Sequence, residues 1–113
     1  MSRPLASSMR CSTAIVTPMK PNGELDQTAL RKLAQFQRRH GVIDIVVNGT
    51  TGESPTTSDH EKQRLLHDVS NADSSINFIA GCGTNDTRHA LQLVDLAKAV
   101  GVSLVLLVDP YYN

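Results

Sequence analysis

The chain has 113 residues, of which 40% are hydrophobic and 19% charged, with 11 basic and 11 acidic side chains. This length corresponds to one domain at most, and the balanced charge produces no net field that would attract nucleic acid or anionic lipid. No apolar run approaches the roughly 20 residues that span a bilayer, and the opening segment MSRPLASSMRCS lacks the apolar core of a secretory signal. We therefore expect a soluble, cytoplasmic protein that binds neither nucleic acid nor membrane, with organellar targeting as the alternative suggested by the Arg- and Ser-containing opening.

The first two predicted strands enclose a predicted helix. The strands are the apolar runs TAIVTP (13–18) and IDIVVNG (43–49), whose β-branched residues are typical of strands buried on both faces in a parallel sheet. The intervening helix can be capped by Asp26 and can stop at Gly41, because glycine is favoured just past a helix end. This part of the chain therefore predicts one β–α–β unit.

The second half of the chain repeats the same alternation. The tetrapeptide SDHE (58–61) is a capping box that predicts the start of a second helix. The apolar run 76–81 predicts a third strand, the helical pattern 87–100 ends before Gly101, and the run 103–110 predicts a fourth strand. The predicted order is therefore β–α–β–α–β–α–β.

Alternating elements of this kind form either a doubly wound open sheet or a (β/α) barrel. A dinucleotide-binding sheet carries a Gly-rich fingerprint after its first strand, but the connection at 17–25 has a single glycine. The nearest match is GCGTND (81–86), which has the first two glycines of the fingerprint and lacks the last. Nucleotide binding is therefore the weaker of the two interpretations.

The most informative turn, NGTTGE (48–53), follows the second predicted strand. Gly49 and Gly52 bracket two hydroxyl residues, Thr50 and Thr51. Such a turn can present backbone N–H groups and two hydroxyl oxygens to one carboxylate or phosphate. From these residues alone, an ordinary tight turn in which the threonines satisfy the local backbone is the more common interpretation.

Four segments at the strand ends together resemble the dihydrodipicolinate synthase and N-acetylneuraminate lyase family of class I aldolases. They are AIVTPM, VVNGTTGES, IAGCGTNDT and PYYN, and the resemblance covers essentially all of the chain after Thr13. It implies a partial (β/α)8 barrel of about four parallel strands and three helices. Residues 13–113 would form the N-terminal half of this barrel, residues 1–12 an N-terminal extension, and the site would lie at the carboxyl ends of the strands.

The resemblance also implies roles for five residues. In the family, a lysine forms a Schiff base with pyruvate or another 2-oxo acid, and the enamine attacks an aldehyde, which is aspartate semialdehyde in the synthase branch that GTTGE favours. Thr51 matches the residue that holds the substrate carboxylate, in a loop shaped by Gly49 and Gly52. Thr50 and Tyr112 match two members of a catalytic proton relay, and Tyr112 reaches into a neighbouring subunit. No cofactor is implied.

The Schiff-base lysine has no counterpart in the chain. Lys20 follows the first strand, whereas Lys32, Lys62 and Lys98 fall on predicted helices and are interpreted as solvated surface charges. The histidines and cysteines have no metal-ligand spacing, so we expect no metal site. A lyase of this family that is inactive as an isolated 113-residue chain is therefore the first hypothesis.

The partners expected from the resemblance are a 2-oxo acid such as pyruvate and a second protein chain. The second chain is another copy or a full-length paralogue, contacted through Tyr111 and Tyr112. The alternative hypothesis is a non-catalytic carboxylate-binding or regulatory partner of that paralogue. Because four strands leave two sheet edges and an apolar face uncovered, we expect the isolated chain to aggregate, to remain partly molten or to pair with a second copy.

Overall fold

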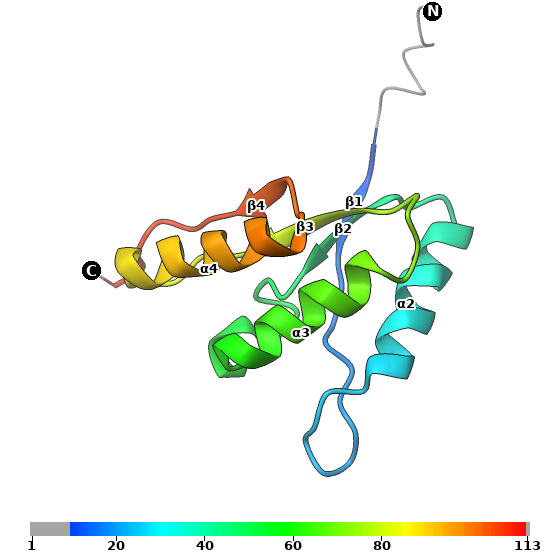
Figure 1. Cartoon of the computed structure of the whole chain (residues 1–113), viewed down its shortest axis with the longest axis horizontal. Helices are drawn as coiled ribbons and strands as arrows, with labels where there is room; N and C mark the ends of the chain where they lie inside the picture. Colours follow the sequence, from blue (N-terminus) through cyan, green and yellow to red (C-terminus); the bar gives the residue numbers. More distant parts are fainter. Residues whose placement is uncertain (1–9, 113) are drawn as a thin grey trace, which may run out of the picture.

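The computed structural model describes residues 10–112 of the chain. Strands and helices alternate along them in the predicted order (Figure 1). The elements are β1 (Ser12–Ala14), α2 (Gln27–Arg39), β2 (Asp44–Val47), the 3-10 helix η1 (Ser54–Thr56), α3 (Asp59–Ser70), β3 (Asn77–Gly81), α4 (Thr87–Val100) and β4 (Leu104–Leu106). Within residues 10–112, none of the helices combines the length and the apolar character needed to cross a membrane.

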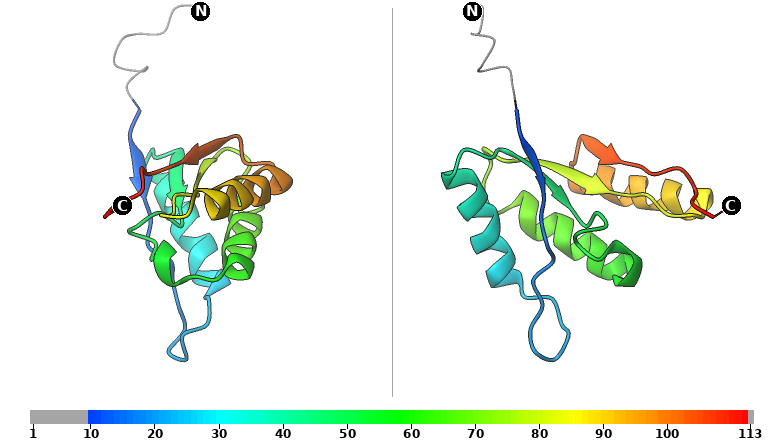
Figure 2. Two further views of the ribbon diagram at one scale, coloured as in Figure 1. Left: turned by 90° about the vertical axis from the view of Figure 1, so that its left-hand side faces the viewer. Right: turned by 180° about the vertical axis from the view of Figure 1, so that it is seen from behind.

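The four strands form one parallel sheet in the order β1-β2-β3-β4, so each strand pairs with the next one along the chain. A doubly wound sheet reverses its strand order and therefore has its first strand inside the sheet. Here β1 lies at one edge, and the three helices gather on one face of the sheet (Figure 2). This arrangement is that of consecutive βα units in a (β/α) barrel, and it confirms the predicted fold class.

Each strand occupies only part of its apolar run, because the carboxyl ends of the runs become loops. β1 ends at Ala14 and β4 at Leu106, although the runs extend to Pro18 and Pro110. Proline cannot donate a backbone hydrogen bond to a sheet. β2 ends where Asn48 adopts a left-handed φ of 58°. The predictions were therefore too long at the ends that carry the site.

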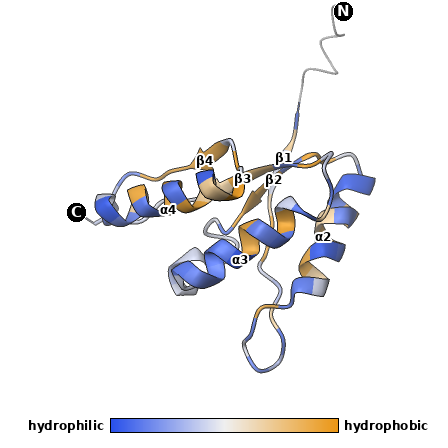
Figure 3. Ribbon diagram, in the orientation of Figure 1, coloured by the Kyte–Doolittle hydropathy of each residue, from blue (hydrophilic) through white to orange (hydrophobic). Residues whose placement is uncertain are grey.

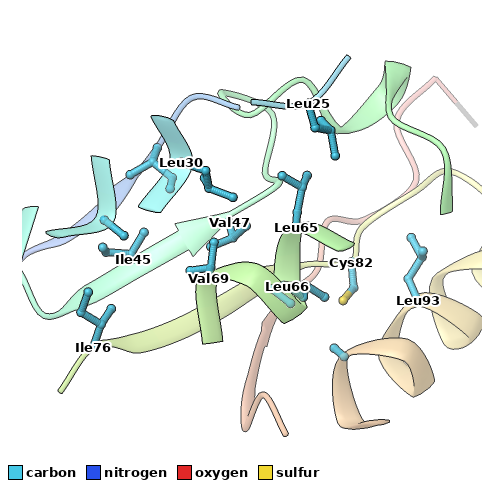
Figure 4. Close-up of a cluster of buried hydrophobic side chains, with 14 residues drawn as sticks. Leu25, Leu30, Ile45, Val47, Leu65, Leu66, Val69, Ile76, Cys82 and Leu93 are labelled. Atoms are coloured by element: carbon cyan, nitrogen blue, oxygen red, sulfur yellow. The ribbon is translucent and has the colours of Figure 1, made fainter. Parts of the chain in front are cut away.

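The hydrophobic core lies between the sheet and the helices (Figure 4). Ile45 and Val47 of β2 point from the sheet into this layer and are fully buried. Leu65 and Val69 of α3 are equally buried on the facing helix, one turn apart on its inner side. The position of the site loops therefore depends on the packing of α3 against β2 and β3.

The opposite face of the sheet is apolar and is only partly covered within the described chain. Ala14, Val46, Ile79 and Leu104 are paired across the four strands and so share this face. Val46 and Ile79 are half-buried in the middle, whereas Ala14 and Leu104 at the edges are exposed. Hydrophobic residues continue along β4 (Figure 3). Burial on both faces, as predicted for every strand, is therefore wrong for β1 and β4, because within residues 10–112 the helices cover only the other face of the sheet.

The predicted capping box at the start of α3 is present, and it provides a testable contribution to stability. The Ser58 hydroxyl accepts from the Glu61 N–H at 3.1 Å, and Glu61 Oε1 accepts from the Ser58 N–H at 2.9 Å. We expect Ser58→Ala to lower the free energy of unfolding by about 1 kcal/mol, because it removes the cap. Ser58→Asp retains a capping oxygen and serves as the control in thermal denaturation. Equal unfolding midpoints for the two variants would contradict this role.

Candidate functional site

The loops at the carboxyl ends of the strands meet around an open cavity of about 390 Å³. The turn after β2, the 83–85 segment after β3 and the residues after β4 all contribute to its wall. Its lining residues include Asn48, Gly49, Thr50, Ser54, Thr57, Lys62, Asn85, His89, Val108 and Tyr111. The structure therefore brings together polar residues that are up to about 60 positions apart in the sequence, at the end of the sheet where the site was expected.

The predicted carboxylate loop is a tight turn between two left-handed residues. The N–H of Gly52 donates to the carbonyl oxygen of Gly49 and the N–H of Glu53 to that of Thr50, both at 3.0 Å. Asn48 enters the turn with φ 58°, and Glu53 leaves it with φ 62°. Left-handed backbone is costly for residues with a Cβ, so the surrounding contacts must hold this conformation in place.

Close packing gives a physical reason for glycine at position 52. The Thr17 hydroxyl donates to the Gly52 carbonyl at 2.6 Å, which ties the turn to the end of β1. A Cβ at position 52 would lie 3.0 Å from the Thr17 Oγ1 and 3.1 Å from the Asn48 Cα. A side chain at residue 52 would therefore force the turn or its neighbours to move apart slightly, and glycine avoids this.

Thr50 and Thr51 form the outward edge of this turn. Both residues are exposed. Within the described part of the chain, neither of their backbone N–H groups donates to a protein acceptor. Two adjacent free N–H groups and two hydroxyls are suited to hold one carboxylate, because each can donate a hydrogen bond to it.

The two tyrosines after β4 lie in different environments. Asn85 Oδ1 accepts from the Tyr111 N–H at 2.7 Å, and Tyr111 lines the cavity. Tyr112 is fully exposed, at 103% of its reference area, and has a φ of 63°, which is unusual for a bulky residue. Among the described residues, no hydrogen bond joins Thr50 to Tyr112. The proton relay therefore stays a prediction.

The interpretation of Lys62 as a solvated surface charge is wrong. Lys62 is only 5% exposed, and its ammonium donates to the carbonyl oxygens of Ser54 and Thr57 at 2.6 and 2.9 Å and to the Thr57 hydroxyl. Sequence reasoning missed it, although a signal was present. Lys62 lies three, four and seven positions before the buried Leu65, Leu66 and Val69, so it belongs to the apolar stripe of α3.

Burial affects one charged group of the cavity wall. Burial lowers the pKa of Lys62 below its ordinary value, and the negative charges of Asp59 and Glu61 oppose that shift. At the rim, His89 Nε2 lies 2.7 Å from Asp59 Oδ1. No three His, Cys, Asp or Glu side chains of residues 10–112 come together in a group that could hold a metal ion.

Comparisons with known proteins agree with this arrangement. Consecutive parallel βα units with polar loops at the carboxyl ends of the strands are the arrangement of a partial (β/α) barrel. The model of the dihydrodipicolinate synthetase family matches residues 7–113, and the chain belongs to this family.

Similar proteins carry the synthase name. The 4-hydroxy-tetrahydrodipicolinate synthase of Acidothermus cellulolyticus is 46% identical over 105 residues, which are 92% of this chain and 34% of the relative. The solved dihydrodipicolinate synthase of Bacillus anthracis is 44% identical with a TM-score of 0.87, over 90% of this chain and 35% of that one. The solved synthase of Acinetobacter baumannii, complexed with pyruvate, is 41% identical with a TM-score of 0.87 over the same shares. The chain thus spans about a third of the length of these proteins.

Proposed function

We propose that this chain supplies the 2-oxo-acid carboxylate site of a dihydrodipicolinate synthase-like lyase. The reaction is a Schiff-base aldol condensation or cleavage that joins pyruvate, or another 2-oxo acid, to an aldehyde, which we take to be aspartate semialdehyde. The observation that carries the proposal is the Thr50–Thr51 turn, whose two N–H groups have no protein acceptor within residues 10–112. The family membership and the pyruvate complex of the Acinetobacter baumannii relative support this ligand. A cytoplasmic location is part of the proposal.

The five predicted site residues have distinct roles in this proposal. Thr51 donates to the substrate carboxylate, while Gly49 and Gly52 allow the backbone to approach it. Thr50 and Tyr112 pass a proton, since a threonine hydroxyl can donate and accept at once and a phenol can do the same. The proposal requires a substrate-induced or partner-induced approach of Tyr112, which is exposed in this structure.

The Schiff-base lysine of the proposed reaction is not among the lysines of this chain. A nucleophilic amine must reach the substrate with a free lone pair. Lys62 has its three N–H groups directed at three oxygens, while Lys32 and Lys98 are exposed on helices. Lys20 is exposed in the loop before α2 and is not among the residues that line the cavity. We therefore propose that the isolated chain binds a 2-oxo acid without catalysing its condensation.

Borohydride trapping with pyruvate tests this division between binding and chemistry. We expect no covalent pyruvate adduct on the isolated chain, because no lysine is placed to form the Schiff base. We expect reversible pyruvate binding, weakened about tenfold by Thr51→Val through the loss of one hydrogen bond to a charged group. Thr28→Val on the exposed side of α2 is the control. A covalent adduct would show that the chain carries its own nucleophile.

A second candidate function is that of a non-catalytic partner of a full-length paralogue or of another copy. It is favoured by the exposure of Tyr111 and Tyr112, which lie edge to face with ring centroids 6.3 Å apart. Paired exposed tyrosines are frequent in protein–protein interfaces. If this candidate is correct, Tyr112→Ala weakens co-purification with the paralogue and leaves pyruvate binding by the isolated chain unchanged. Loss of both would point to a general disturbance of the site.

A further inference from the structure

Lys62 contacts the segment that follows the carboxylate loop, and it lines the same cavity as Thr50. A lysine ammonium has three N–H donors. Here they meet the Ser54 carbonyl at 2.6 Å, the Thr57 carbonyl at 2.9 Å and the Thr57 hydroxyl. All three acceptors belong to the four residues that close the loop, η1 and its C-cap. All three N–H donors of the ammonium therefore form hydrogen bonds with residues 54–57.

The Thr57 hydroxyl extends these contacts to the start of the loop. Asn48 Nδ2 donates to Thr57 Oγ1 at 3.0 Å, and that hydroxyl lies 3.3 Å from Asn48 Oδ1. Asn48 is almost fully buried and begins the turn with its left-handed φ. One buried polar network, made of Lys62, Thr57 and Asn48, thus connects the two ends of the 49–57 loop.

We infer that Lys62 is a positioning residue, whose buried ammonium holds the 49–57 loop in the conformation that presents the Thr50 and Thr51 N–H groups. The identity of the carboxylate ligand in this inference rests on the proposed function. The effect of Lys62 on the loop conformation does not depend on it. An apolar side chain of the same length would fill the space and remove all three hydrogen bonds. The Ser54 carbonyl would keep the Thr57 N–H and the Thr57 hydroxyl would keep Asn48 Nδ2, but the buried Thr57 carbonyl would lose the donor that Lys62 provides. Buried polar groups that lose a partner favour conformations in which water can reach them.

Hydrogen exchange measured by mass spectrometry on the 113-residue chain tests the effect on the loop. In Lys62→Met, we expect amide exchange in peptides covering residues 49–57 to accelerate roughly five- to hundredfold, as for the loss of a buried hydrogen bond. Peptides from α4 should exchange as in the unchanged chain. Lys98→Met, at an exposed lysine of α4, is the matched control and should leave the loop peptides unaffected.

Chemical rescue separates the role of the ammonium from the role of the side-chain volume. Lys62→Ala removes the atoms that n-propylamine can replace, including the three N–H donors. We expect n-propylammonium to slow exchange in the 49–57 peptides of Lys62→Ala, and tetramethylammonium, which has no N–H donor, to have no effect at equal ionic strength. Equal rescue by both cations would overturn the inference.

Two further outcomes keep the inference distinct from the proposed function. If Lys62→Met unfolds throughout, Thr57→Val decides, because it removes one acceptor of Lys62 and should accelerate exchange in the loop alone. The inference is overturned if Lys62→Met exchanges its loop amides at the same rate as the unsubstituted chain. If Lys62→Met unfolds, the same result in Thr57→Val overturns it.

Pyruvate binding separates the inference from the proposed function. If the loop amides exchange faster as expected but the unsubstituted chain binds no pyruvate, the inference about Lys62 stands and the proposed function fails. If pyruvate binds, Lys62→Met should weaken it about tenfold, and Lys98→Met should not.

Discussion

Gly81→Ala is expected to lower the free energy of unfolding by about 3 kcal/mol, because the added methyl group would meet rigid backbone. Gly81 ends β3 directly beside the start of the carboxylate loop. A Cβ built there lies 2.3 Å from the Asn48 carbonyl oxygen, 2.7 Å from its carbonyl carbon and 2.8 Å from the Gly49 Cα. Asn48 cannot move away without breaking its bonds to Thr57. The variant should therefore displace the loop as well as destabilise the fold.

Urea denaturation and pyruvate titration together measure the two effects of Gly81→Ala. Gly49→Ala is the control for stability, since a Cβ at that position lies 3.4 Å from the Val46 Cγ1, an ordinary van der Waals separation. We expect the control to lose less than about 1 kcal/mol. Comparable losses in the two variants would mean that the contact between β3 and Asn48 is not close-packed in solution.

A polypeptide of residues 1–113 is expected to self-associate, with a mass of at least two chains in size-exclusion chromatography with light scattering. β1 and β4 are the outer strands of the described sheet, and unpaired strand edges are templates for another chain. Leu104, Leu106 and Val108 expose side chains along and beyond β4. Together with Val46 and Ile79 on the partly covered face of the sheet, they form an exposed apolar surface. Burying this surface against a second copy is favoured by the hydrophobic effect.

A single charge at the β4 edge tests this origin of association. Leu104→Lys should shift the chain toward the monomer, because a lysine at a sheet edge is costly to bury against a second copy. Leu91→Lys is the matched control: Leu91 is 62% exposed and Leu104 is 55% exposed, but Leu91 lies on α4. A monomer with a sharp thermal transition in the unchanged chain would contradict the prediction, as would equal shifts in the two variants.

Local signals in the sequence were sufficient to predict the helices and their ends. Asp26 caps α2 through the Ala29 N–H, Ser58 and Glu61 form the capping box, and Gly101 ends α4 with a φ of 92°. These features depend on contacts within a few residues, so they can be recognised without knowledge of the tertiary fold. The strand ends were less accurate, because a strand ends where its neighbour stops pairing.

Lys62 illustrates what local reasoning missed in the candidate site. A lysine on a helix is usually solvated, and this general tendency predicts surface positions for Lys32, Lys62 and Lys98 alike. The α3 stripe that contains Leu65 and Val69 already placed Lys62 on the buried side. Its acceptors, however, include the carbonyls of Ser54 in η1 and of Thr57, the C-cap of η1, and no sequence pattern indicates that such oxygens would be available there.

The sequence by itself determined the order of the elements, the helix caps and the family, because these depend on residue identities at short or fixed spacings. It also indicated the Thr50–Thr51 turn and the two tyrosines as site residues. Only the tertiary structure decided that Lys62 is buried and that Thr17, Asn48 and Lys62 form hydrogen bonds with residues 52–57. These properties arise where packing of the sheet against α3 excludes water, because hydrogen bonds formed in such buried places depend on that packing.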